Sequence, residues 1–413
     1  MTLNRRLLTF IFIITATVAA VADNGINSPY SRYGMGVLSD QNLGVNRQMG
    51  GLGYALRSGN YINLLNPASF AATDTLTMLF EAGFSLQNVN FKEGNVQKNV
   101  RNGSFDYLAM QFRAGKNVGI SLGFLPYSNV GYSFATTTSE GGKERTSNYN
   151  GTGGIYQPFI GIGWTPVKNL SIGLMASYIY GDITHSIYNN FTEGNNTDMQ
   201  RQYLVNVKSY KIDFGAQYST QLAGKHNITF GATYSIGHDL NADAMMIETI
   251  TTSDTTKIDG AFKLPHTMGV GAIYNYNDNW KVGIDYTFQN WSAADFFGYD
   301  KGTSRSKVSV GAEYSPNDLL SRNLLKKMSY RMGAYYAQPY TEVQGQKGCE
   351  EYGISAGFSM PIINRINNRS ILHVSGQVIR MEPKGPGLIA ETYMRLNLGI
   401  TFNESWFMKI RVR

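Results

Sequence analysis

The amino-acid sequence predicts an all-β protein, a transmembrane antiparallel β-barrel of about fourteen strands with an N-terminal plug. Three observations predict this fold: an export signal at the start of the chain, runs in which every second residue is apolar, and a low charge content. Only 16% of the residues are charged, whereas an average soluble protein has about 25%. We therefore expect much of the molecular surface to lie away from water.

Residues 1–22 have the pattern of a cleaved signal peptide. Arg5 and Arg6 precede an apolar run over residues 7–21, and Ala20 and Ala22 form a small-residue cleavage site. The run is short for a membrane-spanning helix, which needs about 20 predominantly apolar residues. We expect cleavage before Asp23, and no later apolar run predicts a helix that crosses a membrane.

Residues 23–74 are rich in Gly and Asn and lack strict alternation. Two interpretations compete for them, a disordered periplasmic tail and a plug, or hatch, folded back into the lumen. More than fifty residues without a clear strand is too long for an ordinary loop. Apolar residues such as Leu52, Ile62 and Phe70 argue against disorder, so we expect a hatch.

Residues 75–413 predict the barrel, because runs of about ten residues alternate apolar and polar side chains. Successive side chains of a strand point to opposite faces, so each run has one apolar face and one polar face that suits a watery lumen. About fourteen strands fit between Thr75 and Phe402, and the tail 406–413 either extends the last strand or adds another. The clearest apolar series are Leu170, Ile172, Leu174, Ala176, Tyr178 and Tyr180, and Trp280, Val282, Ile284, Tyr286 and Phe288.

The connections between strands alternate in length, which predicts the orientation of the barrel. Compact turn signals occur at 115–117, 166–169, 224–227 and 277–279. Longer polar stretches at 136–151, 189–200 and 241–257 predict long loops. In outer-membrane barrels the short turns face the periplasm and the long loops face outside, so we expect a bacterial outer-membrane location.

Charge and motifs exclude several classes of function. The net charge of +7 falls to +5 when Arg5 and Arg6 leave with the signal, which is too mild to predict a nucleic-acid partner. The five histidines are too dispersed for a helical ligand pair, so we expect loop, turn or interface positions and predict neither a metal site nor a cofactor. The lone Cys349 has no partner for a disulfide and is expected near a loop.

The sequence Gly-Ile-Ser-Leu-Gly at 119–123 matches the nucleophile motif of serine hydrolases. That motif requires a sharp turn from a strand into a helix, with the serine exposed on it. Here Ser121 lies inside an alternating run, which predicts a strand. We therefore expect a protein that is not an enzyme.

The segment 48–55, Gln-Met-Gly-Gly-Leu-Gly-Tyr-Ala, followed by Asn66, Pro67, Ala68 and Ser69, resembles the N-terminal hatch of FadL-type outer-membrane transporters. The resemblance covers the mature chain in layout and the hatch in residues. It implies a fourteen-stranded barrel with a plug, and passive uptake of long-chain fatty acids or other hydrophobic small molecules. It also implies that Asn66, Pro67 and Ala68 form a hatch element at the ligand conduit.

A fatty-acid carboxylate would need a cationic partner. The residues expected to face the lumen offer candidates, although a solvated lumen charge is the more common role for such a residue. These candidate cations are Arg113, Lys211, Arg395, Lys409 and Arg411.

The segment 28–34 and the ending 406–409 resemble a second branch of the same superfamily. That branch includes barrels that serve in protein secretion or barrel-assembly complexes. Two functions therefore remain open, a transporter of hydrophobic compounds and a structural subunit of a multiprotein outer-membrane complex. The expected partners are outer-membrane lipid together with a hydrophobic ligand in the first case and other outer-membrane proteins in the second.

The segment from Pro316 to Lys327 is amphipathic, with four leucines among Arg322, Lys326 and Lys327. We expect a short helix at the periplasmic end, where it would lie on the membrane interface or bind a partner protein.

Overall fold

The computed structural model describes residues 25–140, 143–191, 199–260, 262–297, 300–318, 321–362, 370–385 and 387–405. The expected signal peptide and the tail beyond residue 405, with Lys409 and Arg411, lie outside the described residues. No helix within the described ranges is long and apolar enough to cross a membrane.

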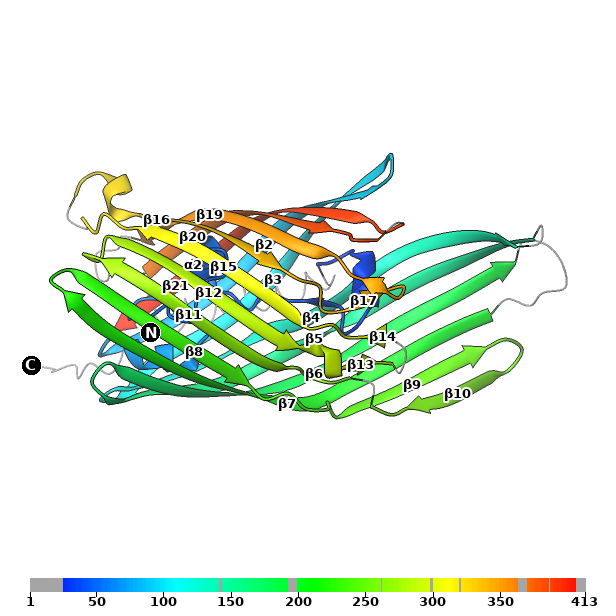
Figure 1. The fold of residues 1–413 in the computed structure, drawn as a ribbon, viewed down its shortest axis with the longest axis horizontal. Helices are drawn as coiled ribbons and strands as arrows, with labels where there is room; N and C mark the ends of the chain where they lie inside the picture. Colours follow the sequence, from blue (N-terminus) through cyan, green and yellow to red (C-terminus); the bar gives the residue numbers. More distant parts are fainter. Residues whose placement is uncertain are drawn as a thin grey trace, which may run out of the picture.

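Fourteen antiparallel strands pair in chain order and close into a barrel where β2 pairs with β21 (Figure 1). This confirms the predicted fold class. The barrel strands are β2 (Thr77–Glu93), β3 (Val96–Gly115), β4 (Val118–Glu140), β5 (Lys143–Val167), β6 (Leu170–Phe191), β7 (Met199–Ala223), β8 (His226–Ser235), β11 (His266–Tyr276), β12 (Trp280–Asn290), β15 (Arg305–Tyr314), β16 (Ser329–Ala337), β19 (Glu350–Ile362), β20 (Ser370–Glu382) and β21 (Ala390–Ser405).

The two faces of the barrel wall differ as the alternation predicts. On β12, Val282 and Ile284 are 52% and 53% exposed on the outer face, whereas Asp285 is 3% exposed in the lumen. Apolar side chains outside and polar side chains inside are typical of a membrane barrel. The predicted short turns at 115–117, 166–169, 224–227 and 277–279 all lie at the end of the barrel where β2 begins and β21 ends, which we call the periplasmic end.

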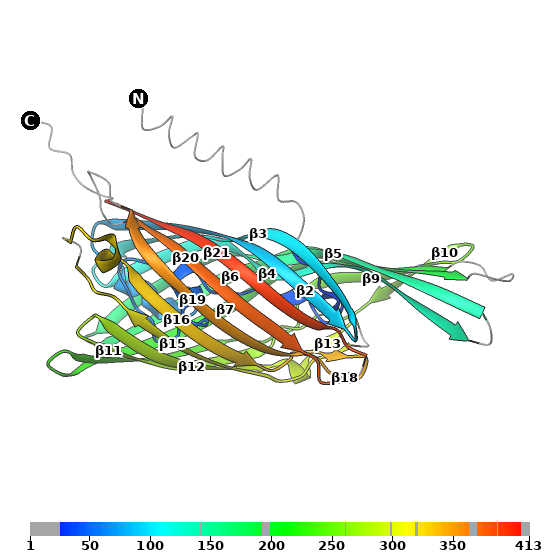
Figure 2. The ribbon, with the colours of Figure 1, turned by 90° about the horizontal axis from the view of Figure 1, so that it is seen from above.

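At the opposite end, strands β4 to β7 extend beyond their neighbours and form a projecting sheet with the hairpin β9 (Ala242–Thr249) and β10 (Ser253–Ile258) (Figure 1 and Figure 2). The prediction of a long loop at 136–151 is wrong, because β4 and β5 stay paired out to Glu140 and Lys143. The prediction at 241–257 is also wrong, since most of that stretch is the hairpin. Outside the membrane neither strand face needs to be apolar, so the alternation that marks a strand disappears.

The mouth of the barrel at this end is packed with apolar side chains. A buried core joins the inner faces of β4 to β7 to the loops that follow β8 and β12. Trp291 in η3 (Trp291–Ala293) and Phe296 in β13 (Asp295–Phe296) are fully buried there. The remaining elements at this end are β14 (Asp300–Lys301), β17 (Glu342–Val343) and β18 (Gln346–Lys347).

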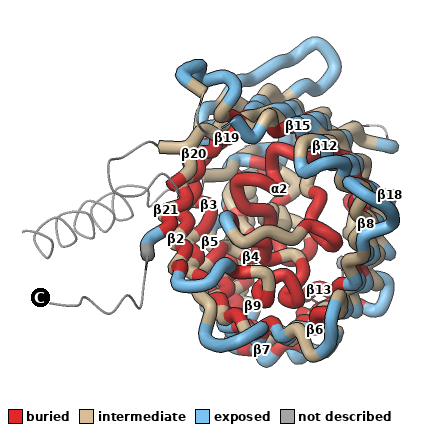
Figure 3. Tube along the Cα trace, turned by 90° about the vertical axis from the view of Figure 1, so that its left-hand side faces the viewer, coloured by how far each residue is buried: buried red, intermediate tan, exposed pale blue. Residues whose placement is uncertain are grey.

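Residues 25–75 lie inside the barrel, which confirms a folded hatch and excludes the disordered tail (Figure 3). Four short elements carry this segment: η1 (Pro29–Arg32), β1 (Val37–Leu38), α2 (Gly44–Gln48) and η2 (Pro67–Ala72). Every residue of α2 is buried, and Figure 3 shows this helix within the ring of strands.

Of the helix predicted between Pro316 and Lys327, the described residues contain one turn, η4 (Leu324–Lys327), at the periplasmic end. Leu324 and Leu325 are exposed on it, while Leu319 and Leu320 lie outside the described residues.

Candidate functional site in the hatch and the barrel wall

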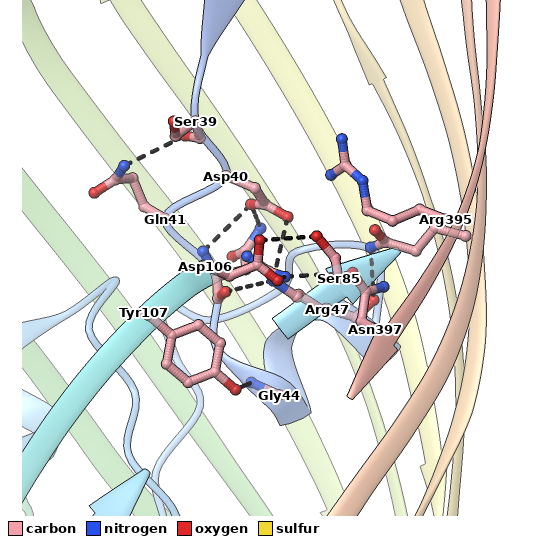
Figure 4. A network of polar contacts seen from close by, with 12 residues as sticks. Ser39, Asp40, Gln41, Gly44, Arg47, Ser85, Asp106, Tyr107, Arg395 and Asn397 are labelled. Carbon is pink, nitrogen blue, oxygen red and sulfur yellow. Dashed lines mark hydrogen bonds and ion pairs between the residues drawn. The ribbon is translucent and has the colours of Figure 1, made fainter. Parts of the chain in front are cut away.

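An ion pair in the lumen joins the hatch to the wall (Figure 4). Nη1 of Arg47, on α2, lies 2.5 Å from Oδ2 of Asp106 on β3, and both side chains are less than 10% exposed. Ser85 donates to the same carboxylate at 2.9 Å, and Arg47 also reaches Asn397 of β21. Burial opposes the charge of Arg47, but Asp106 and Asp40 outweigh it and raise its pKa. The pair fixes α2 against the strands that close the barrel.

Wall carboxylates also hold the hatch through its backbone. Glu81 of β2 accepts hydrogen bonds from the backbone N–H of Gly44 at 3.1 Å and from the Tyr107 hydroxyl at 3.0 Å. Asp285 of β12 accepts from the backbone N–H groups of Gly53 and Tyr54 at 2.6 and 2.9 Å. Hydrogen bonds to charged groups are worth about 1.5–3 kcal/mol each, so these contacts tie both ends of the central hatch firmly to the wall.

A second buried ionic cluster lies on the other side of α2. Glu313 of β15 pairs with Arg331 at 2.5 Å and with Lys281 at 2.8 Å. Arg331 in turn donates to the Gln48 side chain of the hatch at 2.8 Å. The Glu313 carboxylate thus has two cationic partners, and the Arg331 guanidinium has the Gln48 amide oxygen as a further acceptor. These contacts offset most of the free-energy cost of burying the charges.

Asn66, Pro67 and Ala68 begin η2, which packs on the wall in the periplasmic half of the lumen. The Asn66 side chain caps η2 by accepting from the Ala68 N–H at 3.0 Å and donates to Ala216 O of β7 at 3.1 Å. The wall accommodates this contact with glycine: a Cβ on Gly173 would lie 2.3 Å from the Pro67 carbonyl carbon. The three residues thus anchor the hatch, and their predicted place at a conduit stays a prediction.

The structure separates the predicted lumen cations. Arg113 donates to the Thr73 carbonyl at the periplasmic end, and Lys211 forms an ion pair with Asp213 two residues away. Only Arg395 lines the central cavity described below, where it lies beside the Arg47 network (Figure 4). Lys409 and Arg411 are beyond the described residues.

The barrel wall contains a seam between β3 and β4. The two strands pair only from Gly115 and Val118 up to Leu108 and Phe124. Beyond that point they separate, while β3 stays paired with β2 and β4 stays paired with β5. In the described residues 96–140, the facing edges 101–107 and 125–132 do not pair with each other. Exposed backbone edges are costly in a membrane, so another segment has to cover them.

The N-terminal strap, residues 25–41, covers part of this seam. Its strand β1 pairs antiparallel with Asn129 and Ser128 of β4. Ser39 N–H donates to the Tyr127 carbonyl at 2.9 Å, and Gly131 N–H donates to the Ser31 hydroxyl at 3.1 Å. The strap therefore takes the place of a strand along part of the β4 edge.

The strap continues to the non-periplasmic end of β21 and to the loop before β19. Ser28 donates to Glu391 at 2.7 Å, and the Tyr30 hydroxyl donates to the Ile389 carbonyl at 2.6 Å. Tyr30 also contacts Cys349, a buried free thiol whose pKa is raised to about 12 by burial. The thiol is thus near a loop, as predicted, and its neighbour is the strap.

A cavity of about 670 Å³ lies between the hatch, the strap and the wall. Lumen residues such as Asp285 and Lys307 line one side of it. Tyr180, which is exposed on the outer face, and Phe124, which strand pairing puts on the same face, line the other. The cavity therefore runs from the lumen through the seam to the outside of the barrel.

Sequence reasoning missed most of the residues that join hatch and wall. The alternation contained a signal for one of them, because Asp285 falls between the outward residues of the series that begins at Trp280. The prediction for the histidines is wrong at two positions. His373 bonds Ser359 and Thr401 in the lumen at 2.7 and 2.8 Å, because the polar interior of this barrel offers partners to a buried imidazole. His185 is buried against the Tyr132 ring.

The motif at 119–123 lies within β4, where the Ser121 hydroxyl donates to the Met110 carbonyl at 3.1 Å. The serine is therefore on a regular strand and not on a nucleophile elbow. Across the described ranges, no group of three or more His, Cys, Asp or Glu side chains is placed to hold a metal ion.

The fold is similar to that of several solved outer-membrane channels. The CymD monoaromatic hydrocarbon channel matches with a TM-score of 0.60 and 14% identity, covering 91% of this chain and 100% of its own. The Ralstonia pickettii toluene transporter TbuX matches with a TM-score of 0.59 and 15% identity, over 88% and 98%. A Pseudomonas aeruginosa FadL homologue gives a TM-score of 0.60 and 11% identity, over 90% and 99%. These likenesses show a FadL-like outer-membrane barrel fold.

No functionally curated protein matches this chain in sequence. The family model described as BamG matches residues 4–413.

Proposed function

This chain belongs to the BamG family, and from that membership we propose that it is a non-transporting structural subunit of a barrel-assembly complex in the bacterial outer membrane. Its partners in this role are other outer-membrane proteins of the complex and the surrounding lipid. The role needs neither catalysis nor a cofactor, because it consists of holding a rigid barrel in a fixed place among other subunits.

The structural observation that supports the proposal is the fixed hatch. A transport cycle through the lumen would have to pull α2 away from Asp106, Glu81 and the Glu313 cluster. Breaking a buried ion pair by removing one partner costs about 3–5 kcal/mol, and here several such contacts would break together. A hatch held in this way favours a rigid structural part over a moving gate.

A second candidate function is passive uptake of long-chain fatty acids or other hydrophobic small molecules. The sideways cavity supports it, since an apolar molecule could pass from the lumen through the seam. The charged side chains that line the cavity argue against this function. An apolar ligand would displace water from them without forming hydrogen bonds in its place, which costs free energy. We therefore rank it below the structural role.

The deciding experiment is affinity purification of the tagged full chain from native outer membranes in mild detergent. Mass spectrometry would quantify both the co-purifying proteins and the extracted small molecules. We expect outer-membrane proteins of an assembly complex in constant stoichiometry. An unrelated barrel of similar abundance with the same tag serves as the control for nonspecific capture.

Reconstituted vesicles complete the test. The proposal expects uptake of radiolabelled toluene and of a long-chain fatty acid at the rate of protein-free vesicles. A barrel that purifies alone and accelerates uptake of either compound would replace the structural role with the transport role.

A further inference from the structure

The cavity is lined by equal numbers of positive and negative side chains, but not every one of them has a partner of opposite charge. Four carboxylates and four cations line it. Every carboxylate is engaged within the protein: for example, Glu351 pairs with Arg305 at 3.3 Å, and Asp285 binds the hatch backbone. The lining charges are Asp40, Asp106, Asp285 and Glu351, with Arg47, Arg305, Lys307 and Arg395.

Two of the four cations lack such a partner. In the part of the chain that the structure describes, neither Lys307 nor Arg395 forms an ion pair with a carboxylate. Lys307 Nζ lies 4.3 Å from the ring centroid of Tyr335, and Arg395 donates only to the Gln87 side-chain oxygen, at 3.3 and 3.1 Å. A guanidinium presents five donors, so most of those of Arg395 remain available to a ligand.

The outer mouth of the cavity is aromatic. Phe124 stacks on Tyr156 with ring centroids 5.5 Å apart, and Tyr156 contacts Tyr180 at 5.9 Å. Tyr178 extends the row, 5.7 Å from Tyr180. Tyr178 and Tyr180 are exposed on the outer face of the wall. Strand pairing and alternation put Phe124 and Tyr156 on the same face.

The height of this mouth matches that of lipid headgroups. Tyr180 lies about ten residues along β6 from its periplasmic end at Leu170. At about 3.3 Å per residue and a tilt of about 40°, this distance corresponds to a rise of ~25 Å, the height of the apolar band of such barrels. The Tyr180 side of the mouth therefore lies at the outer rim of the membrane, where a headgroup can turn inward while its acyl chains stay in the bilayer.

We propose that this cavity binds the phosphate-bearing headgroup of a membrane lipid, with the phosphate on Lys307 and Arg395 and the acyl chains along the aromatic row Phe124, Tyr156, Tyr178 and Tyr180. A guanidinium fork and an ammonium are the usual ligands of phosphate in proteins. The aromatic row provides the apolar and amphipathic surface that lipid chains and glycerol esters need at the interface. The proposal goes beyond the structural role, because every residue of the site lies in this chain and lipid binding needs no other subunit.

Native mass spectrometry of the full-length barrel, extracted from membranes in a detergent that retains lipid, tests this site. We expect one phospholipid or phosphorylated glycolipid per wild-type barrel. The double variant Lys307→Gln with Arg395→Gln should retain at least tenfold less. The variant Arg395→Lys, which keeps the charge and loses the fork, should retain an intermediate amount.

The matched control is the double variant Lys257→Gln with Arg380→Gln, which removes the same charge from two exposed sites outside the cavity. It should retain lipid as the wild type does. Heat-modifiable migration on gels verifies that each variant is folded, and the two single variants replace the double variant if it does not insert. Retention equal to that of the wild type in the cavity variants would overturn the proposal.

Delipidated barrels distinguish a lipid from a free anion. We expect vesicles containing phosphatidylethanolamine to restore the bound lipid and inorganic phosphate at millimolar concentration not to displace it. Binding of inorganic phosphate alone, with no lipid recovered from vesicles or from native membranes, would refute a lipid site.

Discussion

Arg47 of the hatch and Asp106 of the wall form a buried ion pair at 2.5 Å inside the barrel lumen. The pair belongs to the short helix α2, which has no side-chain cap and owes its position to tertiary contacts. The stability of the hatch thus depends on a few long-range polar contacts.

The variant Arg47→Met should lose about 3–5 kcal/mol of unfolding free energy, because it leaves the Asp106 carboxylate buried without a cation. Urea unfolding of the refolded barrel in detergent micelles measures this loss. Arg380→Met is the matched control, since Arg380 pairs with Glu382 on the surface and such pairs contribute about 0–1 kcal/mol. Equal losses in the two variants would show that the Arg47 pair is not a special constraint.

The variant Asp285→Ala should loosen the middle of the hatch, because the N–H groups of Gly53 and Tyr54 lose their acceptor. Each unsatisfied buried group costs about 1–3 kcal/mol, which corresponds to exchange roughly 5- to 150-fold faster. Hydrogen-exchange mass spectrometry of peptides covering 50–56 measures this change. Asp259→Ala removes an exposed carboxylate from the β10 side and should leave those peptides unchanged. Unaltered exchange in Asp285→Ala would argue against the clamp.

The variant Gly173→Ala should destabilise the protein by about 1–3 kcal/mol, because the new methyl group would overlap the backbone of η2. Gly376→Ala offers a matched control on another wall strand, where a Cβ meets nothing within 4 Å. Thermal unfolding followed by gel mobility compares the two. If both alanines behave alike, the hatch does not press on the wall at Gly173.

Cys349 should report on the strap. With a pKa of about 12, its thiol is about one part in 10⁴ thiolate at pH 8, whereas an ordinary thiol of pKa about 8.5 is roughly one quarter thiolate. We expect maleimide labelling of the folded barrel to be at least a hundredfold slower than that of the denatured chain.

The variant Tyr30→Ala removes the strap side chain beside Cys349 and should accelerate labelling at least tenfold. Tyr352→Ala, an exposed tyrosine on the outer face of β19, is the matched control and should leave the rate unchanged. Fast labelling of the wild-type barrel would mean that the strap does not cover this thiol.

Local patterning predicts the regular part of this structure well. The turns at 115–117 and 277–279 and the strand around Trp280 follow from residue type and alternation alone, because each depends on neighbours in the chain. The same patterning fails for the ends of β4 and β5. Those strand ends lie beyond the membrane, where neither face has to be apolar, so apolar and polar residues no longer alternate along them.

The candidate site could be predicted only in part. Alternation places Asp285 and Lys307 in the lumen, and the resemblance places Asn66 in the hatch. The seam is a property of pairing between β3 and β4, whose residues look like ordinary strand residues in the sequence. The partners of Gly53 and Ser28 lie 232 and 363 positions away, so no local pattern encodes them.

This separation along the chain has a consequence for biogenesis. The strap comes early in the chain, yet of the two residues that bind it Glu391 lies in β21 and Ile389 directly precedes that strand. Contacts between such distant residues form slowly, since a long stretch of chain must be ordered before they can be made. The strap cannot make these contacts until the residues of β21 are in place. Closing of the barrel and docking of the hatch then become a single late event.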